Sequence, residues 1–132
     1  MLTSSRNLAC SLACCVVASA VFAGPPPAAD PCKNPQTQAE MNTCANKRFA
    51  AADTALNAAY KSLMTVVPDE AKDSLRAAQR AWLDYRDKHC ECAAGLATGG
   101  TMFPLVRSEC REKVTTARTA EIRAMETDAR AH

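Results

Sequence analysis

The chain has 132 residues and a formal net charge of +2, from 16 Lys and Arg against 14 Asp and Glu. This length corresponds to one domain, and the near-neutral charge argues against a nucleic-acid binder that depends on a basic surface. Charged residues make up 23% of the chain, which argues against a wholly disordered protein. Its eight cysteines are too many for a typical cytosolic chain of this size.

The first 23 residues have the pattern of a secretory signal peptide. Arg6 supplies a positive charge, and residues 8–21 are uncharged and mostly apolar or small. A small-residue cleavage signal then ends at Ala23. The apolar run is too short for a retained membrane span, and the Gly-Pro-Pro-Pro sequence that begins at Gly24 stops it. We therefore expect a signal peptide over residues 1–23.

A lipid anchor at Cys14 or Cys15 is the weaker alternative. The bulky residue expected before a lipidated cysteine is misplaced for Cys14, and Cys15 follows a cysteine where a small residue is expected. We expect a periplasmic or secreted protein with no transmembrane span after cleavage of the signal peptide.

Residues 24–36 are expected to form an extended leader, because five of them are proline, and the helical domain is expected over residues 37–132. The first helix should run from Gln38 to about Thr65, because residues 37–40 form a Thr-x-x-Glu capping box. Apolar residues recur there at three- and four-residue steps, as on one face of a helix: Met41, Ala45, Phe49, Ala52, Leu56, Tyr60 and Leu63.

A second helix is expected from about Pro68, which suits a first turn, to Cys90 or Cys92. Gly95 and the later Gly-Gly pair should break it. Its expected buried face comprises Ala71, Leu75, Ala78, Trp82, Tyr85 and His89. Its solvated face offers three ion pairs, namely Asp73–Arg76, Arg80–Asp84 and Asp84–Lys88.

A third helix is expected from about Leu105, and the polar residues 126–132 are expected to fray. Its expected buried side comprises Val106, Cys110, Val114, Ala117, Ala124 and Met125. No segment shows the alternation typical of a strand. The predicted fold is all-α: a small disulfide-stapled domain with two long antiparallel helices and a third packed across them.

Five cysteines remain after cleavage, so one has no partner within the chain: Cys32, Cys44, Cys90, Cys92 and Cys110. Cys32 can reach Cys44 on the second helical turn, and Cys90 can reach Cys110 across the glycine loop. Cys90 and Cys92 point about 200° apart on a helix, so they should not bond each other. Cys92 remains an alternative partner for Cys110. Each bridge would contribute roughly 3 kcal/mol in the chain-entropy model.

The His-Cys-Glu-Cys sequence at residues 89–92 offers metal-ligand residue types, but neighbours on one helix cannot all converge on one ion. A disulfide with a histidine at the negative helix end is the favoured interpretation. His89 is the only histidine before the terminal residue, and the sequence has no Gly-x-Ser-x-Gly nucleophile motif. Asp84 and Asp87 share a helix face, but surface ion pairs explain them better than a glycosidase pair does. We expect no enzyme activity, catalytic residue, metal or cofactor.

Trp82, Tyr85 and Arg86 form an aromatic and basic group on the second helix. Core packing is the simpler interpretation of the two aromatic residues. Five polar residues lie near that face: Asn57, Gln79, Arg80, Arg86 and Asp87. They predict a buried or half-buried hydrogen-bond network between the first two helices, and a binding face is the alternative.

A series of short motifs extends from Cys32 to about Ile122. It comprises Cys32, Thr37 to Asn42 with Cys44, Ala52-Asp53, Leu56-Asn57, Tyr60, Ala78 to Trp82, Tyr85-Arg86-Asp87, Cys90, Gly99-Gly100-Thr101, Pro104, Cys110, Thr115, Arg118 and Glu121. The whole series in this order is specific, whereas any single motif is not. The sequence therefore resembles the LprI-type domain of bacterial envelope proteins, a family named for lysozyme inhibition.

The resemblance implies a small, helical, exported domain with disulfides Cys32–Cys44 and Cys90–Cys110. Cys92 departs from the family pattern, in which an aromatic residue is more usual. The implied function is the binding and inhibition of lysozyme. The family has no settled set of inhibitory residues to transfer to this chain.

The segment of residues 95–103 is the best candidate for an inhibitory loop. Lysozyme-type enzymes commonly use two carboxylates in a cleft, and a loop held at both ends by one disulfide loses less entropy on binding. The candidate partner-binding residues are Thr98, Gly99, Gly100, Thr101, Phe103, Arg107 and Lys88. The simpler alternative is a connecting loop, since a near-neutral chain has no general attraction for a basic lysozyme.

Three functions are compatible with these observations. An inhibitor of a cell-wall-cleaving lysozyme is the first, with a protein and no nucleic acid as partner. A periplasmic interaction or immunity module for another envelope enzyme is the second. An enzyme or metal carrier is a distant third.

Overall fold

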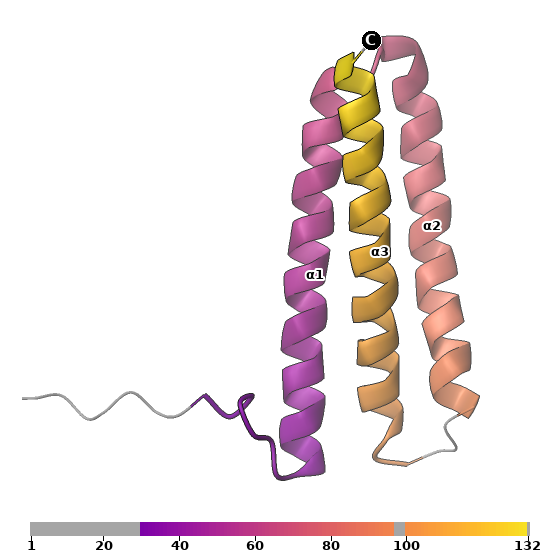
Figure 1. Ribbon diagram of the computed structural model, residues 1–132. Helices are drawn as coiled ribbons and strands as arrows, with labels where there is room; N and C mark the ends of the chain where they lie inside the picture. Colours follow the sequence, from indigo (N-terminus) through magenta and orange to yellow (C-terminus); the bar gives the residue numbers. More distant parts are fainter. Residues whose placement is uncertain (1–29, 97–99, 132) are drawn as a thin grey trace, which may run out of the picture.

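Three long helices stand side by side in the computed structural model, which describes residues 30–96 and 100–131 (Figure 1). They are α1 (Gln38–Val66), α2 (Asp69–Leu96) and α3 (Phe103–Ala131). The described residues contain no strand, and none of their helices is apolar enough over a sufficient length to cross a membrane. The predicted all-α, disulfide-bonded class is therefore confirmed.

The predicted start of α1 is confirmed by a complete capping box. The Glu40 backbone N–H donates to Thr37 Oγ1 at 3.2 Å, and the Thr37 N–H donates to Glu40 Oε2 at 3.0 Å. These bonds satisfy two backbone donors that the first helical turn leaves without partners. The Gln36 N–H also donates to Glu40, and together these backbone bonds lower the pKa of the Glu40 carboxyl.

The other two helices are longer than the sequence predicted. α2 continues beyond Cys92 and through Gly95, because Ala94 is fully buried and this packing offsets the cost of a helical glycine. α3 begins at Phe103 and does not fray after residue 126. Ala129 packs against the core, and Arg130 pairs with Glu126 at 2.7 Å.

The third helix is the central packing element. α1 and α3 run in the same direction and α2 runs opposite to both, with α3 lying along the other two helices (Figure 1). α3 packs most closely on α1 and less extensively on α2, whereas α1 and α2 make little direct contact. Side chains that link α1 to α2 therefore have to bridge a gap between these helices.

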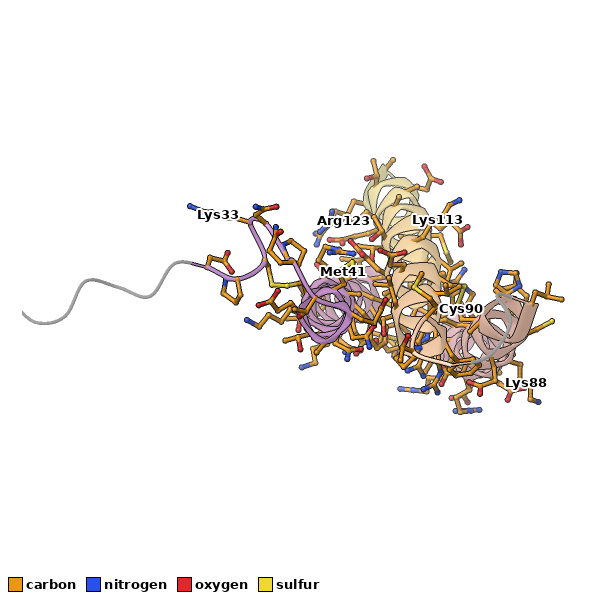
Figure 2. All side chains as sticks on the ribbon, turned by 90° about the horizontal axis from the view of Figure 1, so that it is seen from below. Lys33, Met41, Lys88, Cys90, Lys113 and Arg123 are labelled. Carbon is orange, nitrogen blue, oxygen red and sulfur yellow. A yellow bond between two sulfur atoms is a disulfide. The ribbon has the colours of Figure 1, made fainter. Side chains whose placement is uncertain are left out.

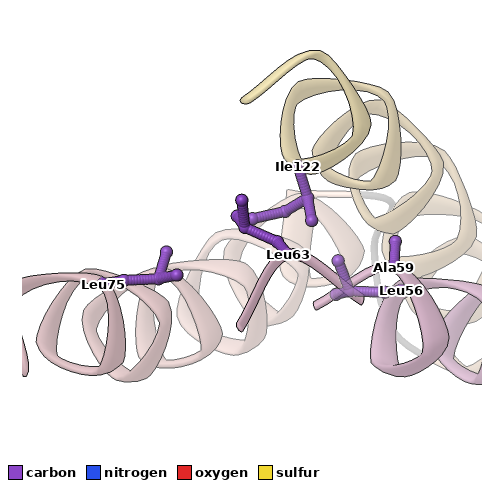
Figure 3. Close-up of a cluster of buried hydrophobic side chains, with 5 residues drawn as sticks. All are labelled: Leu56, Ala59, Leu63, Leu75 and Ile122. Atoms are coloured by element: carbon purple, nitrogen blue, oxygen red, sulfur yellow. The ribbon is translucent and has the colours of Figure 1, made fainter. Parts of the chain in front are cut away.

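The apolar core lies toward the end of the bundle where α1 turns into α2. It is built from residues of all three helices (Figure 3): Leu56, Ala59, Leu63, Leu75 and Ile122. Trp82, Tyr60 and Ala129 pack against this cluster. Toward the other end the buried apolar side chains are mostly small, among them Ala45 and Ala94, so disulfides and polar contacts add stability there.

The buried face of α1 agrees with the prediction, but those of α2 and α3 differ. Tyr85 is 55% exposed, and Ala71, Ala78 and His89 are also exposed. The residues that α2 buries are Leu75, Gln79, Arg86, Cys90 and Ala94. On α3, Ala117, Ala124 and Met125 are exposed, and the buried residues are Leu105, Ser108, Thr115, Thr119 and Ile122. Apolar periodicity failed here because both helices bury polar side chains.

Candidate partner-binding end and the polar layer between the helices

One end of the bundle holds the start of α1, the end of α2 and the start of α3 (Figure 1). Both disulfides lie near this end: Cys32–Cys44, with 5.3 Å between the Cα atoms, and Cys90–Cys110, with 5.5 Å. Seen from this end, Cys90 is on the side of α2 toward α3, and Lys88 projects away from the bundle (Figure 2). The pairing that the resemblance implied is present, and Cys92 is free and exposed.

Polar side chains also connect the helices at this stapled end. Arg48 of α1 reaches Glu109 at 3.2 Å and Glu112 at 2.9 Å on α3. Ser108 donates a hydrogen bond to Asn46 at 2.6 Å. The sequence analysis did not single out these contacts, because ion pairs between helices have no local spacing signal. They hold α1 against α3 at the end away from the cluster of Leu56, Leu63 and Ile122.

The predicted loop is only partly within the described residues, since Thr98 and Gly99 lie outside them. Gly100 has a φ of +89°, a conformation that favours glycine, and its carbonyl accepts a hydrogen bond from the Phe103 N–H at 3.3 Å. Thr101 is exposed, and its carbonyl accepts from Asn42 at 3.5 Å. Phe103 is half-buried, so Gly100 and Thr101 are the more accessible of these predicted residues.

The two cations that flank the loop are both engaged in ion pairs. Arg107 contacts Glu91 at 2.8 Å, and Lys88 contacts Asp84 at 2.8 Å. All four side chains are more than a third exposed. Ion pairs of this kind contribute little stability, so both cations are available to carboxylates of a partner at small cost.

Two exposed apolar side chains border the loop and were not predicted from the sequence. Leu96, the last residue of α2, is 79% exposed, and Met102, just before α3, is 43% exposed. Large apolar side chains in contact with water favour burial against a partner. Neither has a sequence signal, because a lone Leu or Met beside a glycine loop is more often buried.

The buried Arg86 is the centre of a polar layer between the helices. It is 6% exposed, and it bonds Asp53 of α1 at 2.8 Å and Asp87 at 3.0 Å. Its guanidinium carbon lies over two aromatic rings, 5.2 Å from the centroid of Phe49 and 5.5 Å from that of Trp82. These cation–π contacts and the two ion pairs offset the cost of burying the charge.

Two arginines of α3 extend this layer. Arg111 also lies over the Phe49 ring, 4.9 Å from its centroid, and Arg118 also lies over the Trp82 ring, 5.8 Å from its centroid. Arg111 also bonds Asp87 at 2.6 Å. Burial alone would raise the pKa of Asp87, but the hydrogen bonds from Arg111 and Arg86 outweigh it and hold this pKa below its ordinary value. The layer therefore joins all three helices.

The predicted polar residues divide into two groups. Arg86, Asp87 and Trp82 belong to the layer, and Gln79 accepts a hydrogen bond from Arg118 at 3.3 Å. Tyr85 does not belong to it but stacks on His89 at the surface, with 5.3 Å between ring centroids. Arg80 is exposed and Asn57 donates to Asp53 at 3.2 Å. The sequence-based network omitted Phe49, Asp53, Arg111 and Arg118, although Asp53 and Arg118 were part of the family motif series.

The His-Cys-Glu-Cys segment does not converge on a single point. Cys90 is in a disulfide, Glu91 pairs with Arg107, and Cys92 is exposed. No group of three or more His, Cys, Asp or Glu that could hold a metal ion occurs within residues 30–96 and 100–131.

Comparison with known proteins identifies the family. A family model described as "Lysozyme inhibitor LprI" matches residues 29–122. The chain belongs to the LprI family. This LprI-family chain is also similar to "Uncharacterized protein R02472" of Rhizobium meliloti (strain 1021), with 34% identity over 130 residues that cover 89% of this chain and 91% of the relative. No solved structure matches it.

Proposed function

We propose that the chain is an exported inhibitor that binds a cell-wall-cleaving lysozyme through its stapled end. The observation that carries this proposal is the convergence of both disulfides and the Arg48 ion pairs on the end that holds Leu96 and residues 100–103. A binding surface held in place before association loses less conformational entropy when the complex forms. Membership of the LprI family supports a protein partner of this class.

The disulfides support export, because such bonds persist in the periplasm and outside the cell. The proposed signal peptide, residues 1–23, lies outside the described part of the chain. We place the protein in the periplasm or the medium after cleavage near Ala23.

Inhibition at this end requires occupation of a cleft and no chemical step. Leu96 and Met102 would supply apolar anchors, and Gly100 and Thr101 would allow the backbone to approach the cleft closely. Arg107 and Lys88 would exchange Glu91 and Asp84 for the two carboxylates of a lysozyme-type active site. The protein thus acts as a binder and not as an enzyme.

Lysis of cell-wall substrate by several lysozyme classes tests the proposal, with the oxidised protein titrated into each reaction. We expect a stoichiometric loss of lysis with at least one class. Met102→Asp should weaken inhibition by about tenfold or more. Met125→Asp is the matched control, because Met125 has the same 43% exposure at the opposite end of α3.

Three results would contradict parts of this proposal. Equal inhibition by Met102→Asp, Met125→Asp and the unmodified protein would move the site away from the loop. Equal weakening by both variants would indicate a general effect of the added charge. Full lysis with every class would exclude inhibition and favour an interaction or immunity module for another envelope enzyme.

A further inference from the structure

A hollow of about 230 Å³ lies between α1 and α2, away from the stapled end. It is lined by Asn57, Tyr60, Arg76, Gln79, Arg80 and Leu83. Drug-sized ligands fill pockets of roughly 300–1,000 Å³, so this hollow has room for one functional group or one small residue. Asn57, Gln79 and Arg80 are among the polar residues for which the sequence allowed a binding face as the alternative to a hydrogen-bond network.

The hollow has an excess of positive charge. Arg80 forms no ion pair with any residue in the described part of the chain, since the predicted partner Asp84 pairs with Lys88 instead. Arg76 contacts only Asp73, whose side chain is 94% exposed, and such a pair contributes little. Asp53 accepts a hydrogen bond from Asn57 but is also bound to the buried Arg86. No carboxylate lines the hollow.

Gln79 adds a hydrogen-bond donor to this charge. The residue is only 8% exposed, and its Oε1 accepts the hydrogen bond from Arg118 at 3.3 Å. The Nε2 group of the same amide donates to no residue among those described, although the side chain lines the hollow. This amide group is therefore free to donate to an acceptor inside the hollow.

We propose that this hollow is a binding site for a carboxylate carried by a peptide. Guanidinium groups and an amide N–H₂ are donors that match the planar carboxylate, and the Tyr60 ring and Leu83 provide apolar surface for an adjoining methyl or methylene group. A singly charged carboxylate fits one unpaired arginine better than a phosphate with nearly two charges does. A peptide C-terminus and an acidic side chain share this chemistry. The proposal does not depend on lysozyme inhibition.

Nuclear magnetic resonance titration of the ¹⁵N-labelled, oxidised protein tests this site directly. The probes are acetyl-Ala-Ala with a free C-terminus, its C-terminal amide, acetyl-Glu-amide and inorganic phosphate. Either carboxylate probe should shift the Gln79 Nε2 and Arg80 Nε signals in a saturable way, and the tighter of the two identifies the source. The amide of acetyl-Ala-Ala should produce no saturable shift.

A pair of arginine variants provides the control. Arg80→Ala should weaken carboxylate binding by about tenfold or more. Arg123→Ala should not, because Arg123 is an exposed arginine of α3 that makes no ion pair with the residues described here. Both should keep the thermal midpoint of the unmodified protein. Absence of saturable shifts, equal binding of the amide, tighter binding of phosphate or an unchanged affinity in Arg80→Ala would each overturn the proposal.

Discussion

Nη1 of Arg86 on α2 lies 2.8 Å from Oδ1 of Asp53 on α1, and this ion pair joins two helices that otherwise make little direct contact. The guanidinium is buried and lies over the rings of Phe49 and Trp82, so water has little access to it. Because this contact requires Arg86 to face α1, α2 buries a charged residue and leaves the neighbouring Tyr85 exposed.

Replacement of Arg86 should be strongly destabilising. Arg86→Met removes the hydrogen bonds to Asp53 and Asp87. Because both carboxylates are more than a third exposed, the loss should be that of hydrogen bonds to charged groups, about 1.5–3 kcal/mol. Arg86→Lys should lose less, because the charge is kept while the stacking is lost. Urea unfolding followed by circular dichroism measures both. An Arg86→Met protein as stable as Arg80→Met, an exposed control, would show that this ion pair does not hold α2 to α1.

Stability should decline in acid. The pKa of Asp87 lies below its ordinary value of 3.8 and that of Glu40 below 4.5 in the folded protein. Both carboxyls therefore bind protons less readily when folded, so their stabilisation is present above about pH 4–5 and is lost as the pH falls through the folded values.

Thermal midpoints between pH 7 and pH 2 test this dependence. The midpoint should be nearly constant at neutral pH and fall below about pH 4. Asp87→Asn should lower the midpoint at pH 7, because Arg111 and Arg86 lose a charged partner, and should flatten the decline in acid. An Asp87→Asn profile parallel to that of the unmodified protein would contradict the role given to this carboxylate.

Removal of the second disulfide should lower the free energy of unfolding by about 3 kcal/mol, the entropy expected for a loop of this length. The variant is Cys90→Ser combined with Cys110→Ser, measured by chemical denaturation. Cys92→Ser should change stability by less than about 0.5 kcal/mol, because Cys92 is free and exposed. A large loss in Cys92→Ser would instead indicate a bond from Cys92 to Cys110.

The burial of α3 can be tested with two apolar residues that the sequence and the structure rank differently. Ile122→Ala should cost about 2–5 kcal/mol, because Ile122 is fully buried in the core. Met125→Ala should cost less than about 1 kcal/mol, because Met125 is 43% exposed. Equal losses of unfolding free energy in Ile122→Ala and Met125→Ala would instead support the buried face of α3 that apolar periodicity predicted.

Local chemistry made much of the fold predictable. The capping box at Thr37 and the stop at Pro68 depend on neighbouring residues, so they determine where α1 begins and ends whatever the tertiary packing. The family motif series correctly implied both disulfides. Part of the candidate loop was also recognisable, because glycine in a φ > 0 turn is a local requirement at Gly100.

The sequence by itself thus determined three helices, two of their starting points and the cysteines that staple them. Only the tertiary structure decided which faces of α2 and α3 are buried and which residues reach across the helices. The physical reason is that the apolar face of an alanine-rich helix differs little from its other faces. Which face is buried therefore depends on the polar layer. The Arg86 guanidinium is stable in the interior only when Phe49, Trp82, Asp53 and Asp87 surround it together, and these partners come from segments far apart in the chain.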